Sequence, residues 1–145
     1  MKQPLLLAVA VIAIAAPSWA LEFRTSTRPA ILYDAPSQRA TRLAVTGTGV
    51  PFEVFVETES WIKVRDVTGR LAWLEKSALG NTHTVMVNVD QAEVLQQPAA
   101  GAEVRFRAAR GVLLQAQGAP RDGWIEVQHV DGLRGWVRRH EVWGE

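Results

Sequence analysis

The fold is decided by the segment WIKVRD at residues 61–66, followed by AWL at residues 72–74. The same arrangement returns as WIEV at residues 124–127 and GWV at residues 135–137, and in both places the two tryptophans are twelve residues apart. Tryptophan is rare, so two pairs at one spacing indicate an internal duplication. Within these segments aliphatic residues alternate with other residues, which is the period of a β-strand.

The duplication extends over nearly all of the chain after residue 20. An offset of 62 residues places AILYDAP at residues 30–36 on AEVLQQP at residues 92–98, and an offset of 63 aligns the tryptophans. We therefore expect one domain at residues 21–80 and a second at residues 84–143. A unit of about 60 residues buries only about 60% of the surface of its unfolded chain, which makes it marginally stable alone. The joint between the units is short and rich in turn-forming residues, so we expect the units to contact each other.

The two units are predicted to be all-β. Alternation at residues 52–57 and 85–90 continues the period-two pattern, and Gly69 and Gly132 supply the positive φ that tight hairpins need. Five short strands bury their faces most simply by closing into a small barrel. The segment at residues 99–109 is rich in Ala and Arg, and there we expect an irregular loop or a single helical turn.

We expect the first twenty residues to be a cleavable signal peptide with a signal helix. Lys2 provides the positive charge, an apolar run of twelve residues follows from Leu5 to Ala16, and Ser18 and Ala20 are the small residues of a cleavage site. Twelve residues rise about 18 Å as a helix, which is too short to span a bilayer. We expect an exported, periplasmic protein whose mature chain has no membrane span.

Composition excludes several classes of protein. The chain has 145 residues and no cysteine, so neither a disulfide framework nor a cysteine-based zinc site is available. Sixteen basic and fifteen acidic residues leave no general attraction to nucleic acid. We expect no cofactor and no metal.

The sequence resembles the bacterial SH3-like domain family. In the first unit the resemblance lies in YDAPS at residues 33–37, GVPFEV at residues 49–54, and the tryptophan segments. The second unit keeps the tryptophan segments and GLRGWV at residues 132–137, but LQQ at residues 95–97 replaces the tyrosine-bearing motif. The resemblance implies two small five-stranded SH3-like barrels in tandem, without catalytic residues, that bind a protein partner or peptidoglycan in the cell envelope.

The candidate ligand-binding residues are Trp61, Trp124, Tyr33, Lys63 and Arg65. Strand alternation places Trp61 and Trp124 opposite buried aliphatic residues, so we expect them to be partly exposed, while Trp73 and Trp136 are expected in the cores. An exposed indole can stack on a sugar or a peptide, or it can close the interface between the units. Lys63 and Arg65 can hold carboxylates of a peptide, or they can be solvated residues that protect a strand.

Catalysis is not expected, although a small peptidoglycan hydrolase is the alternative function. The three histidines have no counterpart in the other copy, so no shared base is available for a triad. Ser60 and Lys63 match the S-x-x-K motif of acyl-transfer enzymes, which requires a helix. On a strand, residues three apart point to opposite faces, so the motif is not functional here.

Overall fold

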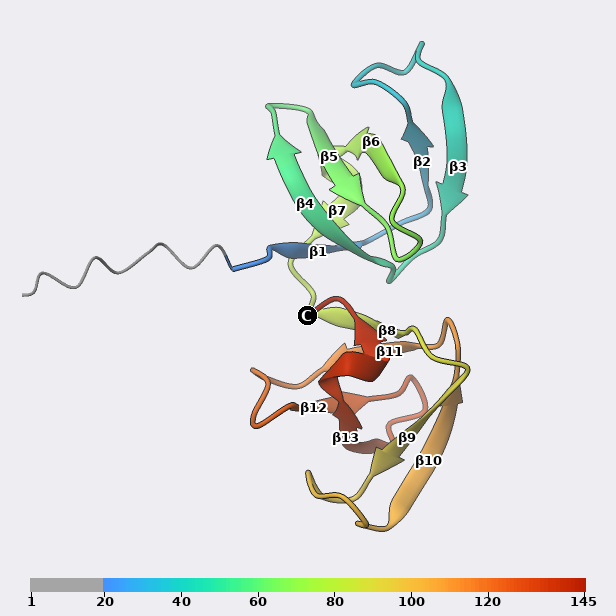
Figure 1. Ribbon diagram of the computed structural model, residues 1–145. Coiled ribbons are helices and arrows are strands. Elements are labelled where there is room, and N and C mark those ends of the chain that lie inside the picture. Colours follow the sequence, from blue (N-terminus) through green and yellow to red (C-terminus); the bar gives the residue numbers. More distant parts are fainter. Residues whose placement is uncertain (1–19) are drawn as a thin grey trace, which may run out of the picture.

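The computed structural model describes residues 20–145, which fold into two domains stacked end to end (Figure 1). The expected signal peptide lies outside the described residues. Within residues 20–145 there is no helix long and apolar enough to cross a membrane.

The first domain is a strongly curled antiparallel sheet. Its strands are β1 (Phe23–Ser26), β2 (Ala30–Tyr33), β3 (Arg42–Thr46), β4 (Pro51–Glu57), β5 (Trp61–Arg65), β6 (Leu71–Glu75) and β7 (Leu79–Gly80), with the 3-10 turn η1 (Lys76–Ala78) before β7. Their order in the sheet is β3-β2-β6-β5-β4-β1-β7.

The second domain repeats this arrangement. Its strands are β8 (Thr84–Val87), β9 (Gln91–Leu95), β10 (Val104–Ala109), β11 (Leu113–Ala116), β12 (Trp124–Gln128), β13 (Arg134–Arg138) and β14 (Val142–Trp143), with η2 (Arg139–Glu141) before β14. The order is β10-β9-β13-β12-β11-β8-β14, which matches the first sheet strand for strand. The all-β class and the duplication are confirmed.

Each sheet has seven strands, and the prediction of five was too low. In the first domain the sequence patterns did not reveal the first and last strands, β1 and the two-residue β7, whereas β8, the first strand of the second domain, lies in the predicted alternation at residues 85–90. β1 and β7 pair with each other, with Thr25 opposite Gly80. These two short strands form because the ends of the domain meet in space.

The expectation of an irregular loop or helical turn over residues 99–109 is wrong in its second half. Residues from Val104 to Ala109 form β10, which pairs with β9. Val104, Phe106 and Ala108 face inward while the residues between them are exposed. Pairing with a neighbouring strand outweighs the helical propensity of the Ala and Arg residues.

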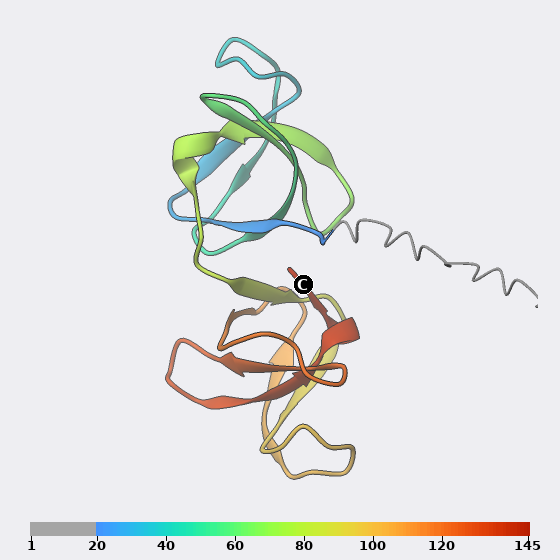
Figure 2. The ribbon, with the colours of Figure 1, turned by 90° about the vertical axis from the view of Figure 1, so that its left-hand side faces the viewer.

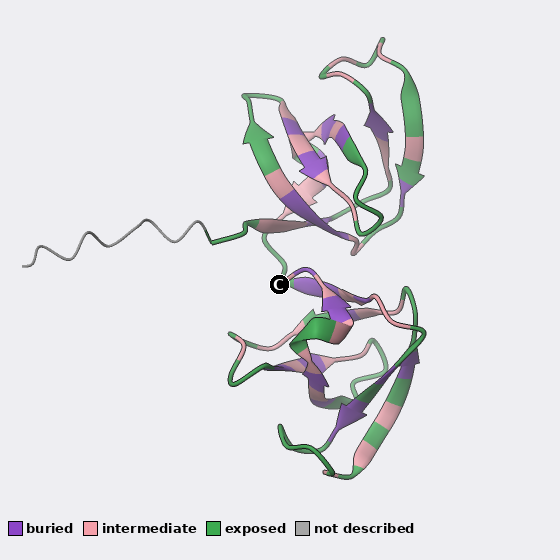
Figure 3. Cartoon of the chain, in the orientation of Figure 1, coloured by how far each residue is buried: buried purple, intermediate pink, exposed green. Residues whose placement is uncertain are grey.

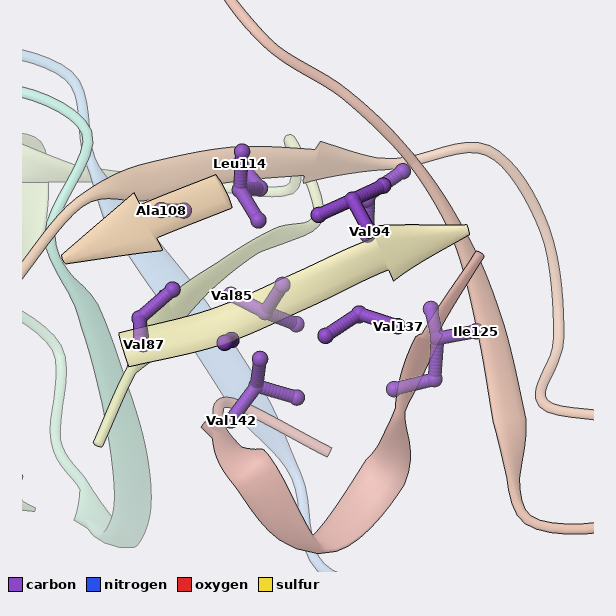
Figure 4. Close-up of a cluster of buried hydrophobic side chains, with 10 residues drawn as sticks. Val85, Val87, Val94, Ala108, Leu114, Ile125, Val137 and Val142 are labelled. Atoms are coloured by element: carbon purple, nitrogen blue, oxygen red, sulfur yellow. The ribbon is translucent and has the colours of Figure 1, made fainter. Parts of the chain in front are cut away.

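Each domain has its own hydrophobic core. Strands of the second domain contribute the buried residues drawn in Figure 4, among them Val85, Leu114, Ile125 and Val137. The core of the first domain is smaller in number but contains the larger Phe52 side chain. Figure 3 shows that β3 and β10, the outer edge of each sheet, are mostly exposed, with partly buried positions between exposed ones along β10. These cores fix the positions of the strands that carry the surface residues described below.

The two domains contact each other through the last strand of the second. The Trp143 ring meets Phe23 of β1 edge-on, with ring centroids 5.3 Å apart, and the guanidinium of Arg65 lies 5.6 Å from its centroid. Gly144 approaches so closely that a Cβ there would lie 3.2 Å from Cβ of Pro51. Only residues 81–83 connect β7 to β8, and both views show the domains directly stacked (Figure 2). The expected contact between the units is therefore present.

Candidate functional site

A surface cleft of about 800 Å³ lies beside Trp61 at the end of the first domain. Three segments form it: the β2–β3 loop, the β4–β5 turn, and the stretch that joins β6 to η1. Its lining residues are Pro36, Ser37, Gln38, Arg39, Glu59, Ser60, Trp61, Glu75, Lys76 and Ser77. β5 begins at Trp61 and runs from this cleft toward the second domain (Figure 1).

Local hydrogen bonds fix the position of Trp61. Its backbone N–H donates to the Thr58 hydroxyl at 3.1 Å, and its carbonyl accepts from the Thr58 backbone N–H at 2.8 Å. The buried Tyr33 ring stands edge-on to the indole, with centroids 5.6 Å apart and an interplanar angle of 82°. An indole held at its backbone and at one edge loses little freedom when its remaining face contacts a ligand.

The charges of the cleft are arranged in pairs around its rim. Glu75 accepts from Nε2 of Gln38 at 2.5 Å and from the Arg28 guanidinium at 3.2 Å, and these bonds lower the pKa of Glu75 from its ordinary value. Lys76 forms an ion pair with Glu57, and this ammonium lowers the pKa of Glu57, with a further contribution from Arg24. The cleft therefore presents an aromatic face between fixed groups of both signs.

The corresponding place in the second domain is different. Trp124 is buried, with 9% of its surface exposed, so the expectation that it is partly exposed is wrong. The guanidinium of Arg138 lies over the indole, 4.9 Å from the ring centroid. Alternation correctly placed Trp124 outside the aliphatic core, but it gave no information about which side chain would cover it.

Trp73 and Trp136 are half-buried and lie outside both core clusters, so their assignment to the cores is wrong. On β6 and β13 the buried positions are their neighbours, Leu74 and Val137 among them. The Arg121 guanidinium covers Trp136 at 4.8 Å from the ring centroid. A tryptophan beside a buried aliphatic residue on a strand must face the other way.

The other candidate residues divide between two regions. Tyr33 is 6% exposed and supports Trp61 from below the cleft. Arg65 points to the domain junction, where its Nε donates to the buried Glu53 carboxylate at 2.7 Å and its guanidinium lies over Phe55 and Trp143. Lys63 is half-buried in the middle of β5 and does not line the cleft. Of the five candidates, the structure brings together only Tyr33 and Trp61.

The groups considered for catalysis lie apart. Ser60 lines the cleft and Lys63 does not, as expected for a strand. Nε2 of His83 is 3.0 Å from the Gly144 carbonyl oxygen, and Nδ1 of His129 is 3.1 Å from the Asp131 carboxylate. Among residues 20–145 no cluster of His, Asp or Glu has the geometry of a metal site.

Sequence reasoning missed the residues that give the cleft its charge, Glu75 and Lys76, and the loop that contributes Gln38 and Arg39. One signal was available in the repeat itself. Glu75 aligns with Arg138 at the offset of 63 that aligns the tryptophans, so a reversal of charge marks this position.

Comparison with known proteins gives one family and two distant structures. The family model described as the bacterial SH3 domain matches twice, at residues 26–80 and 88–144. No curated protein matches. Among solved structures, NlpC2 from Trichomonas vaginalis is similar at 12% identity with a TM-score of 0.40, over 85% of this chain and 47% of its own. NlpC1 from the same organism is similar at 14% identity and a TM-score of 0.40, over 94% of this chain and 51% of its own.

The chain thus spans about half the length of both of these proteins. The two family matches cover most of the described residues, and each contains one pair of tryptophans at the twelve-residue spacing. The chain belongs to the bacterial SH3 domain family, with two copies in tandem.

Proposed function

We propose that this chain is a non-catalytic binding protein of the cell envelope, exported to the periplasm, and that the Trp61 cleft holds its ligand. The observation that carries the proposal is the half-buried Trp61 indole at the side of an 800 Å³ cleft, on a domain whose family consists of binding modules. Exposed, rigidly held aromatic side chains are the usual anchors of recognition surfaces.

The chemistry of the cleft favours a peptide as its ligand. An indole face can stack on planar amides and on aliphatic side chains, while Arg39 and Lys76 can pair with carboxylates of a ligand and Glu59 and Glu75 with its amines. A short peptide carries all of these groups. We propose a peptide segment of an envelope protein as the ligand, with the peptide of peptidoglycan as the alternative source of the same chemistry.

The expected signal peptide supports the placement in the envelope. The family resemblance supports a role in recognition. Removal of Lys2 with the signal peptide leaves equal numbers of basic and acidic residues, so attraction by net charge does not drive binding. Ligand contacts must then come from the local pattern of groups in the cleft.

Two measurements on the processed chain test the proposal. A photo-reactive residue in place of Ser37, which lines the cleft, is expected to crosslink one envelope protein in cells, and Trp61→Ala is expected to abolish the crosslink. Pull-down with purified sacculi at moderate salt tests the wall, and Trp61-dependent retention there identifies the peptidoglycan peptide as the ligand. Trp73→Ala is the matched control, because Trp73 is half-buried on β6 and does not line the cleft.

Two outcomes contradict the proposal. The first is that neither a crosslink nor sacculus retention depends on Trp61. The second is that the purified chain releases soluble muropeptides from sacculi, which establishes the alternative function of a small hydrolase.

A further inference from the structure

The two tryptophans that begin β5 and β12 have partners of opposite charge. Trp61 is the cross-strand partner of Glu75, and Trp124 is the cross-strand partner of Arg138. The pairs occupy the same register in two sheets of the same strand order. The two indoles therefore occupy equivalent places on matching sheets, although the segment before Trp124 (residues 117–123) is longer than the segment before Trp61 (residues 58–60).

In the second domain, Arg138 closes the place where a ligand would sit. Its guanidinium carbon lies 4.9 Å from the Trp124 ring centroid, and the ring is left with 9% exposure. The face of an indole carries negative electrostatic potential, so a guanidinium is attracted to it. A side chain of the same domain, Arg138, therefore already covers the Trp124 ring.

In the first domain, the corresponding side chain is Glu75, and it is hydrogen-bonded to residues other than Trp61. A carboxylate is repelled by the same ring face. Glu75 instead accepts from Gln38 at 2.5 Å and from Arg28 at 3.2 Å. The second copy has Ala100 where the first has Gln38, at the offset of 62 that aligns these loops. The Gln38 amide that bonds Glu75 thus has no counterpart in the second domain.

We infer that the residue at this one position, Glu75 or Arg138, decides whether the aromatic cleft of a domain is open, and that each chain has a single open cleft. The second domain is a closed copy whose Arg138 replaces the ligand. This inference rests on the proposed function for its biological meaning, but the opening of each cleft is measured without any ligand.

The test is residue-resolved oxidation of tryptophan, followed by mass spectrometry of the intact two-domain chain. In the wild type we expect Trp61 to be oxidised several-fold faster than Trp124. Glu75→Arg is expected to protect Trp61 several-fold, and Arg138→Glu is expected to expose Trp124 to a similar degree. Trp73 in the same digest reports any general change in accessibility.

Matched variants separate charge from disruption. Glu75→Gln keeps the size and adds no cation, so Trp61 is expected to remain reactive. Arg139→Glu makes the same charge change as Arg138→Glu at the neighbouring residue, and Trp124 is expected to remain protected. If circular dichroism shows that Arg138→Glu unfolds the domain, Arg138→Lys is used instead. Lysine keeps the positive charge but has no planar guanidinium to cover the ring, so the oxidation rate of Trp124 is expected to rise by a smaller factor.

The inference is overturned if Trp61 and Trp124 react equally in the wild type, or if the swaps leave both rates unchanged. Ligand binding is a separate readout. If Glu75→Arg protects Trp61 but leaves the position-37 crosslink and sacculus retention intact, the cleft is closed as inferred and the proposed function at Trp61 is wrong.

Discussion

The outer edges of the two sheets differ although their backbones match. On β2 and β3 of the first domain, Ile31 pairs with Val45, and Val45 is 75% exposed. At the same register in the second domain, Glu93 pairs with Arg107, and the two side chains form an ion pair at 3.1 Å. Charged edges resist pairing with other chains, whereas apolar edges invite it.

The same contrast recurs at the cleft and at the junction. The first domain has an open indole, and the second has an indole covered by Arg138. Gly80 is the last residue of the first sheet. At the equivalent place in the second sheet lies Trp143, which packs against Phe23 of the first domain. Duplication kept the barrel while the surfaces diverged: the first copy leaves its indole at an open cleft, and the second covers its own indole and packs Trp143 on the first.

The largest expected effect separates the two tryptophans by stability. Trp124→Ala is expected to lower the free energy of unfolding by about 3–5 kcal/mol, the cost of truncating a buried tryptophan. Trp61→Ala removes a half-buried ring at a cleft and is expected to shift the melting temperature by only a few degrees. Urea unfolding of both variants measures the difference, and equal losses would contradict the division of roles.

The junction pair provides the next test. Glu53 is 4% exposed and is paired with Arg65, whereas the second domain has Gln115 and Gln128 at the equivalent positions. Arg65→Met leaves a carboxylate buried without its cation and is expected to cost about 2–3 kcal/mol. The double variant Glu53→Gln with Arg65→Gln copies the second domain and is expected to recover most of that loss in the same unfolding experiment. Failure to recover would show that Arg65 acts through its contacts with the Phe55 and Trp143 rings rather than through its pairing with Glu53.

The indole at the domain junction is expected to hold the two domains together. Trp143→Ala removes the contacts with Phe23 and Arg65 and is expected to cost about 2 kcal/mol, about half the value for a fully buried tryptophan. Small-angle scattering is expected to show a larger radius of gyration with both sheets intact. His140→Ala, on the neighbouring turn, is the control, and an unchanged radius in Trp143→Ala would contradict the role of the ring.

The smallest expected effect is a dependence on pH. Hydrogen bonds from Lys76 and Arg24 lower the pKa of Glu57, and those from Gln38 and Arg28 lower the pKa of Glu75, both from an ordinary value of 4.5. A lowered pKa in the folded state stabilises the fold above that ordinary value, and the stabilisation disappears as the pH falls below it. In thermal melts, the melting temperature of Glu75→Gln is expected to fall slightly less between pH 7 and pH 3 than that of the wild type. If both fall by the same amount, the hydrogen bonds of Glu75 contribute nothing measurable to stability.

Several features of the fold could be predicted because they depend on local pattern. The tryptophan spacing revealed the duplication, and the alternation of Ile62 and Val64 with their neighbours revealed strands. Gly69 and Gly132 were predicted at hairpins and have φ angles of +87° and +91°. β1, β7, β14 and β10 were missed, since these strands form only where a neighbour supplies their hydrogen bonds.

The candidate site was predicted only in part. Trp61 and Tyr33 were named, and they do meet at the cleft. Trp124, Lys63 and Arg65 were named on the same reasoning and lie elsewhere, because alternation gives the face of a residue but not the side chain that will cover it. Glu75 was missed although its alignment with Arg138 was visible in the sequence.

The sequence by itself determined that this chain is a duplicated all-β protein, because strand period and repeat spacing are properties of neighbouring residues. The tertiary structure alone decided which indole is open. That outcome depends on a guanidinium reaching the Trp124 ring across one strand pair, and on a glutamine from a distant loop holding Glu75 away from Trp61. Both are contacts between side chains from separate segments, and they exist only after the sheet has brought those segments together.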